Sequence, residues 1–313
     1  MITIDPSHIS NSLDAAYATA SALTGGKNAD YIPYLAGVPS GLFGLAVVTP
    51  DGQVHERGDA RHEFAIESIS KVLTLAAAIE EVGPEQLRAK IGAEPTGMPF
   101  NSVMALEMHD DRPLSPLVNA GAMATASLLT AANADDRWAK ILAMQSRLAG
   151  RQIRLSDEVN TSEQTTNFHN RAIAWLLYSG GNMFCDPMEA CDVYTRQCST
   201  LVTAVDLATI GATLANGGIN PVTRERVLKA DNVPPILAEM MMEGLYDTSG
   251  DWAFQVGLPA KSGVGGGLVA VAPGRLAIAG FAPPLDPVGN SVKAQAGVAA
   301  VAKALGLNLF RSA

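Results

Sequence analysis

The spacing of hydrophobic and polar residues changes twice along this chain. Residues 10–23 carry apolar side chains at helical spacing, and Gly25-Gly26 ends that pattern. Residues 43–48 and a segment around Val54 then have a strand-like pattern on either side of Pro50-Asp51-Gly52, which is a turn signature. The N-terminal stretch is therefore predicted to form a helix followed by two paired strands.

From about residue 70 to 246 the pattern is almost entirely helical. Asp186 before Pro187 is typical of a helix start, and Asn216-Gly217-Gly218 is typical of a helix end. The periodicity predicts helices over residues 70–82, 121–132, 137–148, 167–177, 188–198, 206–216 and 236–245.

The C-terminal stretch returns to strands. Residues 268–272 and 276–281 are β-type runs separated by Pro273-Gly274-Arg275, which predicts a hairpin, and an amphipathic helix follows over 291–305. Strands near both termini with helices between them predict an α/β (α+β) fold with one sheet built from both ends of the chain. We expect a single domain, 1–313, with an α/β part at about 1–69 plus 250–313, a helical part at about 70–249, and a cleft between them.

Composition narrows the class of protein. Hydrophobic residues make up 48% of the 313 positions and charged residues 17%, as in a folded globular protein. A net charge of −9 without a Lys/Arg cluster argues against a nucleic-acid partner, and no apolar run approaches the roughly 20 residues that span a bilayer. The N-terminus has no secretory pattern, so we expect the three cysteines to be reduced thiols in a cytoplasmic protein.

Candidate chemistry begins with Ser68 and Lys71, where a strand-like segment meets a helix. At this spacing the hydroxyl and the amine share one helical face, close enough to share a proton. A serine needs a base to become a nucleophile, and a desolvated lysine can be that base. Ser-x-x-Lys is short, so an ordinary exposed helix start is the alternative.

A second lysine precedes the C-terminal strands, in Lys261-Ser262-Gly263. Such a motif on a strand, after an upstream Ser-x-x-Lys, resembles the arrangement of serine β-lactamases and penicillin-binding proteins. The alternative is a strand entry with a solvated lysine. The following Val264-Gly265-Gly266-Gly267 is not a phosphate loop, because no Gly-Lys-Ser/Thr follows it.

The chain resembles a more specific family with this fold, the serine-dependent glutaminases. The resemblance extends from residue 30 to about 282 and implies an antiparallel β-lactamase/transpeptidase-like sheet flanked by helices, with a helical insertion. The matching blocks are Asp30-Tyr31-Ile32-Pro33, Glu67-Ser68-Ile69-Ser70-Lys71, Pro116-Leu117-Val118-Asn119-Ala120-Gly121-Ala122, Ser162-Glu163 with Asn170, Tyr194-Thr195, Gly244-Leu245-Tyr246-Asp247 and Lys261 to Gly267.

The resemblance implies hydrolysis of the side-chain amide of L-glutamine to L-glutamate and ammonia through a glutamyl-serine intermediate. Ser68 would be the nucleophile and Lys71 its base, with a pKa lowered by burial and by the charge of Lys261. The N–H groups of Ser68 and Val264 would bind the oxyanion, and Tyr246 would shuttle protons.

Substrate recognition by resemblance places the α-ammonium group on Glu163. Asn119, Asn170, Tyr194 and Tyr31 match positions that bind the amino-acid end or the amide. Each has a plainer alternative. Asn119 suits a helix N-cap, Glu163 and Asn170 suit one solvated helix face, and the tyrosines suit packing.

Glu67 stands where many family members carry glutamine, so its contact with the substrate is open. The five histidines lack metal-ligand spacing, and the resemblance implies neither a metal nor an organic cofactor. It also implies a homo-oligomer, a dimer or a tetramer. A β-lactamase or esterase on the same scaffold is the alternative enzyme, and an inactive amino-acid-binding module is the alternative from another class.

Overall fold

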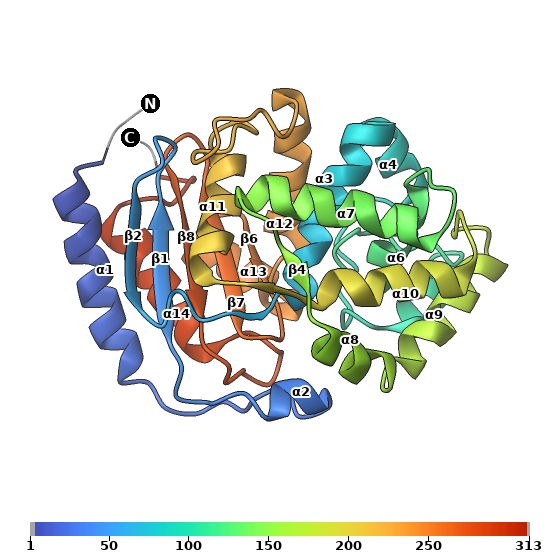
Figure 1. The fold of residues 1–313 in the computed structure, drawn as a ribbon, viewed down its shortest axis with the longest axis horizontal. Coiled ribbons are helices and arrows are strands. Elements are labelled where there is room, and N and C mark those ends of the chain that lie inside the picture. The colour runs from blue at the N-terminus through green and yellow to red at the C-terminus, as the bar shows by residue number, and fades with distance from the viewer. Residues whose placement is uncertain (1–3, 312–313) are drawn as a thin grey trace.

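A five-stranded antiparallel sheet forms one half of the molecule (Figure 1). The computed structural model describes residues 4–311. The sheet has the order β2-β1-β8-β7-β6, so strands from both ends of the chain lie side by side at β1 and β8. Its strands are β1 (Gly44–Val48), β2 (Val54–Gly58), β6 (Ala260–Ser262), β7 (Gly267–Ala272) and β8 (Leu276–Phe281).

Helices cover both faces of this sheet. Side chains alternate along a strand, so Leu45 and Val47 pack with α1 (Pro6–Ser21) and α14 (Val292–Ala304) on one face. Their neighbours Ala46 and Val48 belong to the opposite core, where α11 (Ala204–Ala215) packs. Burial on both faces explains why β1, β6, β7 and β8 are buried along their whole length.

The second half is a helical layer around α3 (Ser70–Val82), drawn at the right of Figure 1. Residues 70–79 of α3 are all buried, because α4, α6, α7, α10 and α12 pack around it. The surrounding helices are α4 (Pro84–Lys90), α5 (Val103–Glu107), α6 (Asn119–Leu128), α7 (Ala134–Ala149), α8 (Asp157–Gln164), α9 (Phe168–Ser179), α10 (Pro187–Cys198) and α12 (Val233–Glu243).

Shorter elements join the two halves. The minor sheet has the order β3-β5-β4, with β3 (Phe64–Ala65), β4 (Arg154–Leu155) and β5 (Thr200–Val202). The remaining short helices are α2 (Pro33–Ala36), η1 (Glu67–Ile69), η2 (Ala230–Asn232), η3 (Tyr246–Thr248) and α13 (Ser249–Gln255). Strand β3 leads directly into η1 and α3, so the minor sheet places the start of α3 at the junction of the halves.

The predicted helices and strands are all present, with ends shifted by a few residues. Asp186 caps α10, as predicted, by accepting hydrogen bonds from the N–H groups of Met188 and Glu189. The pattern missed the short helices α2, α4, α5 and α13, the polar helix α8, and the strands β4 and β5 of the minor sheet. Helix α8 is too polar to show an apolar stripe, and strands of two or three residues are too short to show a period.

The sheet from both termini and the antiparallel α/β architecture are confirmed. The proposed division at residues 69 and 249 stays a prediction. Helix α11 lies inside the stretch assigned to the helical part, yet it packs on the sheet.

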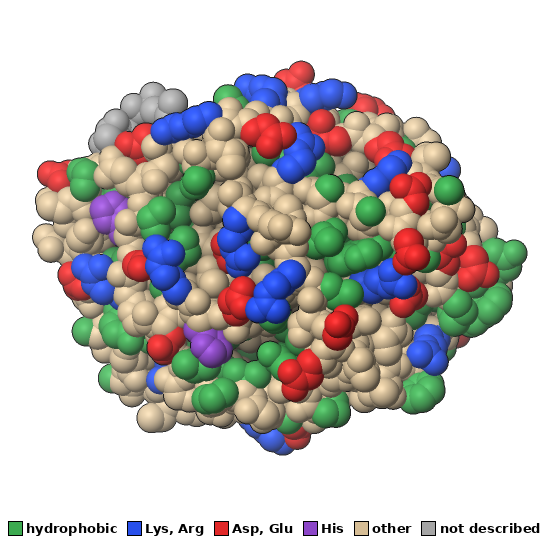
Figure 2. Space-filling model, in the orientation of Figure 1, with side chains coloured by type: hydrophobic (Ala, Val, Ile, Leu, Met, Phe, Trp, Pro, Cys, Tyr) green, Lys and Arg blue, Asp and Glu red, His purple; other side chains and the backbone are tan. Residues whose placement is uncertain are grey.

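Charges of both signs are interspersed over the face in Figure 2. The protein's charged side chains include ion pairs such as Arg151 with Asp206 at 2.6 Å and Arg147 with Glu225 at 2.8 Å. Within residues 4–311, no helix combines the length and the apolar character needed to cross a membrane.

The end of α12 lies directly against β6 at Gly244. A Cβ atom added to Gly244 would lie 1.7 Å from the carbonyl oxygen of Ala260, so only glycine fits there. Gly244 O in turn accepts hydrogen bonds from Ser262 N–H and from Lys261 Nζ. This contact ties the helical layer to the strand that carries Lys261.

We expect Gly244→Ala to lower the free energy of unfolding by about 3 kcal/mol, because the added methyl group overlaps a backbone carbonyl. Gly250→Ala is the control, since a Cβ at Gly250 in α13 meets nothing within 4 Å. Thermal denaturation of both variants checks this. Equal melting temperatures for the two would contradict the close packing of α12 on β6.

Candidate active site

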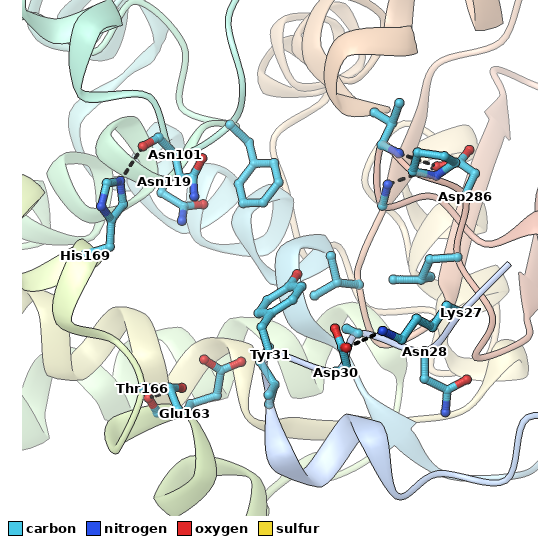
Figure 3. Close-up of a pocket in the computed structure, with 18 of the residues that line it drawn as sticks. Lys27, Asn28, Asp30, Tyr31, Asn101, Asn119, Glu163, Thr166, His169 and Asp286 are labelled. Carbon is cyan, nitrogen blue, oxygen red and sulfur yellow. Dashed lines mark hydrogen bonds and ion pairs between the residues drawn. The ribbon is translucent and has the colours of Figure 1, made fainter.

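A cleft of about 800 Å³ opens where the helical layer meets the loops below the sheet. Its walls include Tyr31, Asn119, Glu163, Asn170 and Val264, five of the predicted site residues. Figure 3 shows Tyr31, Asn119 and Glu163 around this opening; they come from the loop before α2, from α6 and from α8. The other predicted residues, Ser68, Lys71, Tyr194, Tyr246 and Lys261, are buried.

Ser68 sits in a strained turn between β3 and α3. The preceding residue, Glu67, has φ +51°, in the left-handed region that non-glycine residues seldom adopt. The 3-10 turn η1 then runs straight into α3, which places Lys71 one turn after Ser68. The sequence alternative of an exposed helix start is wrong, because Ser68 is 7% exposed and Lys71 is 1% exposed.

The Lys71 amine is buried away from solvent, and no carboxylate among the described residues forms an ion pair with it. Within residues 4–311 its Nζ donates one side-chain hydrogen bond, to Asn119 Oδ1 at 2.7 Å, and none to Ser68 Oγ. Burial lowers the pKa of Lys71 to about 8, while Cys198, Glu243 and Glu67 act against this decrease. The amine is therefore much closer to neutrality at physiological pH than an exposed lysine.

Asn119, at the start of α6, is hydrogen-bonded to side chains of three other helices, α3, α9 and α10. Its Oδ1 accepts from Lys71 Nζ and, at 3.0 Å, from Tyr194 Oη, while its Nδ2 donates to Asn170 Oδ1 at 2.9 Å. The residue that caps α6 is Val118, and Asn119 makes no capping bond. The N-cap alternative for Asn119 is therefore wrong, and its amide orients the lysine.

The glycine-rich turn after β6 packs tightly against the Ser68 segment. A Cβ atom on Gly265 would lie 2.2 Å from Ala65 O, and one on Gly263 would lie 2.8 Å from Ile66 O. This approach needs glycines on both sides of Val264. Among the described turns and loops, the N–H groups of Val264 and Ser68 donate to no backbone carbonyl.

Tyr246 and Lys261 form the sheet side of the site. The Tyr246 hydroxyl donates a hydrogen bond to Ser262 O at 3.4 Å. Burial raises the pKa of Tyr246 far above its usual range, and the nearby Ser68 hydroxyl acts against this increase. Lys261 Nζ lies 4.6 Å from the centre of the Tyr246 ring and donates to Ser262 O at 2.7 Å. Burial, followed by the Lys71 charge, holds the pKa of Lys261 well below its usual range.

Glu163 and Asn170 do not share one helix face, so that alternative is wrong. Glu163 lies near the end of α8. Asn170 lies in the first turn of α9, after a short non-helical segment that separates the two helices. Burial raises the pKa of Glu163. Both residues line the same cleft as Tyr31.

Comparison with known proteins identifies this arrangement. The Glutaminase family model matches residues 26–310, most of the chain and all the residues above. The chain belongs to the glutaminase family.

Relatives of this glutaminase match over nearly their whole length. It is 64% identical over 308 residues to Glutaminase 1 of Escherichia coli (strain K12), covering 98% of this chain and 99% of that protein. It is 67% identical over 302 residues to a glutaminase of Brucella canis, covering 96% of this chain and 95% of that protein.

Two solved structures give the same result. The structure of a "Probable glutaminase ybaS" has a TM-score of 0.98 at 64% identity, covering 99% of this chain and 100% of that one. A probable glutaminase from Bacillus subtilis complexed with 6-diazo-5-oxo-L-norleucine has a TM-score of 0.86 at 30% identity, covering 99% of both chains. The protein therefore has the β-lactamase-like fold of serine-dependent glutaminases and hydrolyses the side-chain amide of glutamine. The comparisons support the glutaminase assignment over the β-lactamase, esterase and binding-module alternatives.

Sequence reasoning missed two residues of this glutaminase site. Glu243, buried at the end of α12, accepts a hydrogen bond from Thr96 N–H, and its charge raises the pKa of both Lys71 and Lys261. Phe100 lines the cleft, with its ring centre 5.0 Å from that of Tyr246. The only sequence signal for Glu243 is its place just before the Gly244-Leu245-Tyr246 block.

We expect Glu243→Gln to move the acid limb of kcat/KM for glutamine to lower pH. Removing the carboxylate lowers the pKa of Lys71 further, so a larger fraction of the amine is neutral at each pH. Glu239→Gln is the control, because Glu239 lies one turn earlier on α12 and is bonded to Ser115. A limb that shifts equally in both variants, or in neither, would contradict the coupling of Glu243 to Lys71.

Proposed function

We propose that this glutaminase works through a glutamyl-serine intermediate formed on Ser68, with Lys71 as the base. The observation that carries the proposal is the buried Lys71 amine, one turn from Ser68 and without a carboxylate partner. Its pKa of about 8 lets it accept a proton from the serine hydroxyl during attack on the amide carbon. Hydrogen bonds of this kind commonly shorten only when substrate is bound.

Tyr246 and Lys71 both lie near the serine, but only one suits the task of base. Burial raises the pKa of the Tyr246 hydroxyl, so the tyrosinate form would be a strong base but is almost never populated. Tyr246, whose hydroxyl lies beside Ser68, instead relays protons to the departing ammonia and from the incoming water. Lys261 positions Tyr246 by placing its amine over the ring.

The oxyanion of the tetrahedral intermediate binds to the N–H groups of Ser68 and Val264. The close packing of the glycine-rich turn on the Ser68 segment supports this role, because it brings together two N–H groups that donate to no backbone carbonyl in the described turns and loops. Because both N–H groups are already held in place, the protein does not have to reorganise when negative charge develops on the amide oxygen.

Glutamine binds with its amide toward Ser68 and its amino-acid end in the cleft. Glu163 binds the α-ammonium group, while Tyr31, Asn119, Asn170 and Tyr194 supply neutral donors and acceptors for the remaining polar groups. A relative of 35% identity, Mglu, has been solved in its glutamate form, and glutamate is the product of this reaction.

We also propose a cytoplasmic homo-oligomer, a dimer or a tetramer. The three cysteines are free thiols, which suits a reducing compartment. Large apolar side chains are exposed on α5 and α9, as at an interface between subunits; they are Met104, Met108, Phe168, Trp175 and Tyr178.

We expect Ser68→Ala and Lys71→Met each to lower kcat for glutamine by about 10³-fold or more, because one removes the nucleophile and the other its base. Ammonia release measures this, and Ser179→Ala on the exposed end of α9 is the control. Unchanged melting temperatures would show that the folds are intact. Wild-type turnover by either variant would rule out the proposed pair.

We expect asparagine to be hydrolysed with a kcat/KM about 100-fold lower than that of glutamine. Asparagine is one methylene shorter, so its amide does not reach Ser68 while the ammonium group stays on Glu163. A coupled assay with both amides tests this. Similar kcat/KM values would contradict the anchoring of the amino-acid end.

A further inference from the structure

Glu67 and Glu163 bring two carboxyl groups close together beside the cleft, where Glu163 lines the wall and Glu67 is buried behind it. The two side chains face each other within hydrogen-bonding reach, although they lie on η1 and α8. Glu67 is 3% exposed. Among residues 4–311, neither carboxyl forms an ion pair.

The surroundings of Glu67 are poor for a negative charge. Its Oε1 is buried and receives no hydrogen bond from any donor in the described part of the chain. Its stem is packed against the glycine-rich turn, since a Cβ on Gly265 would lie 3.2 Å from Glu67 Cγ. An ionised Glu67 would leave a bare oxygen beside a second carboxylate, whereas a protonated Glu67 finds its acceptor in Glu163.

Few of the groups that face Glu67 could offset a second charge. Lys71 is the one cation among them, and its Nζ is directed to Asn119. The facing groups are Glu163 on α8, Lys71 on α3, Tyr31 before α2, Tyr194 and Cys198 on α10, and Tyr246 on η3. Burial first, and then the Glu163 charge, hold the pKa of Glu67 well above its usual range.

We propose that Glu67 carries a proton at neutral pH and donates it in a hydrogen bond to the Glu163 carboxylate, so that the pair presents one negative charge to the substrate's ammonium group. Glu67 is thus a positioning residue that acts through Glu163. This proposal rests on the proposed binding of the ammonium group by Glu163. A neutral Glu67 also keeps the pKa of Lys71 low, because an ionised carboxylate at Glu67 would raise the pKa of this base.

The first test compares substitutions at both carboxyls by glutamine kinetics at pH 7. Glu67→Ala removes the donor to Glu163, and we expect KM to rise at least about tenfold. Glu67→Gln restores an uncharged N–H donor of the same length, and KM returns to within about threefold of wild type. Glu163→Gln removes the charge itself, and we expect KM to rise about 100-fold.

The second test measures the proton directly through melting temperature against pH. In the unfolded chain Glu67 loses its proton near pH 4.3, whereas in the native protein it stays protonated above that pH. The wild-type protein therefore loses stability as the pH rises above about 4.3. Glutamine at this position cannot ionise. Glu67→Gln should therefore melt about 2 °C or more above wild type at pH 7 and within ~1 °C of it at pH 4.5. Glu158→Gln, at an exposed position on α8, is the control and should show no such rise with pH.

The results separate this proposal from the function it rests on. A Glu67→Gln variant that loses as much affinity as Glu163→Gln, or whose melting difference is independent of pH, would place the charge on Glu67 and overturn the inference alone. An unchanged KM in Glu163→Gln would overturn the ammonium site as well, while loss of activity in Ser68→Ala would still support the nucleophile.

Discussion

The site depends on the burial of two lysine amines, Lys71 and Lys261, where the sheet meets the helical layer. Among the residues that the structure describes, neither amine has a carboxylate in hydrogen-bond contact, and both bond to neutral oxygens. Desolvation disfavours the ammonium form, so it lowers the pKa of both side chains. The same burial raises the pKa of Tyr246, and the fold thereby separates a usable base from a proton relay.

Such burial requires unusually close contact between the two halves of the molecule. Gly244 brings the end of α12 onto β6, and Gly263 and Gly265 bring the glycine-rich turn onto the Ser68 segment. Each contact is between backbone atoms, so a methyl group at any of these positions would push the halves apart. The strained backbone at Glu67 belongs to the same arrangement, since it turns the chain sharply from β3 into α3.

Much of the fold could be predicted from local pattern. Helix α3 begins and ends where its periodicity indicates, and the hairpin of β7 and β8 follows from its turn residues. Helix α8, which carries Glu163, could not be predicted in this way, because Val159 is its one buried residue and no apolar stripe marks it. The motif blocks identified Ser68, Lys71, Asn119 and Tyr246, but the bond from Lys71 to Asn119 joins positions 48 residues apart.

By itself, the sequence determined which chemical groups are present, the order of the elements and the family to which the chain belongs. These depend on residue identity and on local spacing, which a linear pattern records. The tertiary structure alone decided the charge of those groups. Lys71, Glu243, Glu67 and Glu163 come from four separate elements, and the pKa of each depends on its burial and on the others' charges. Both the burial and the distances between these charges exist only after the chain has folded.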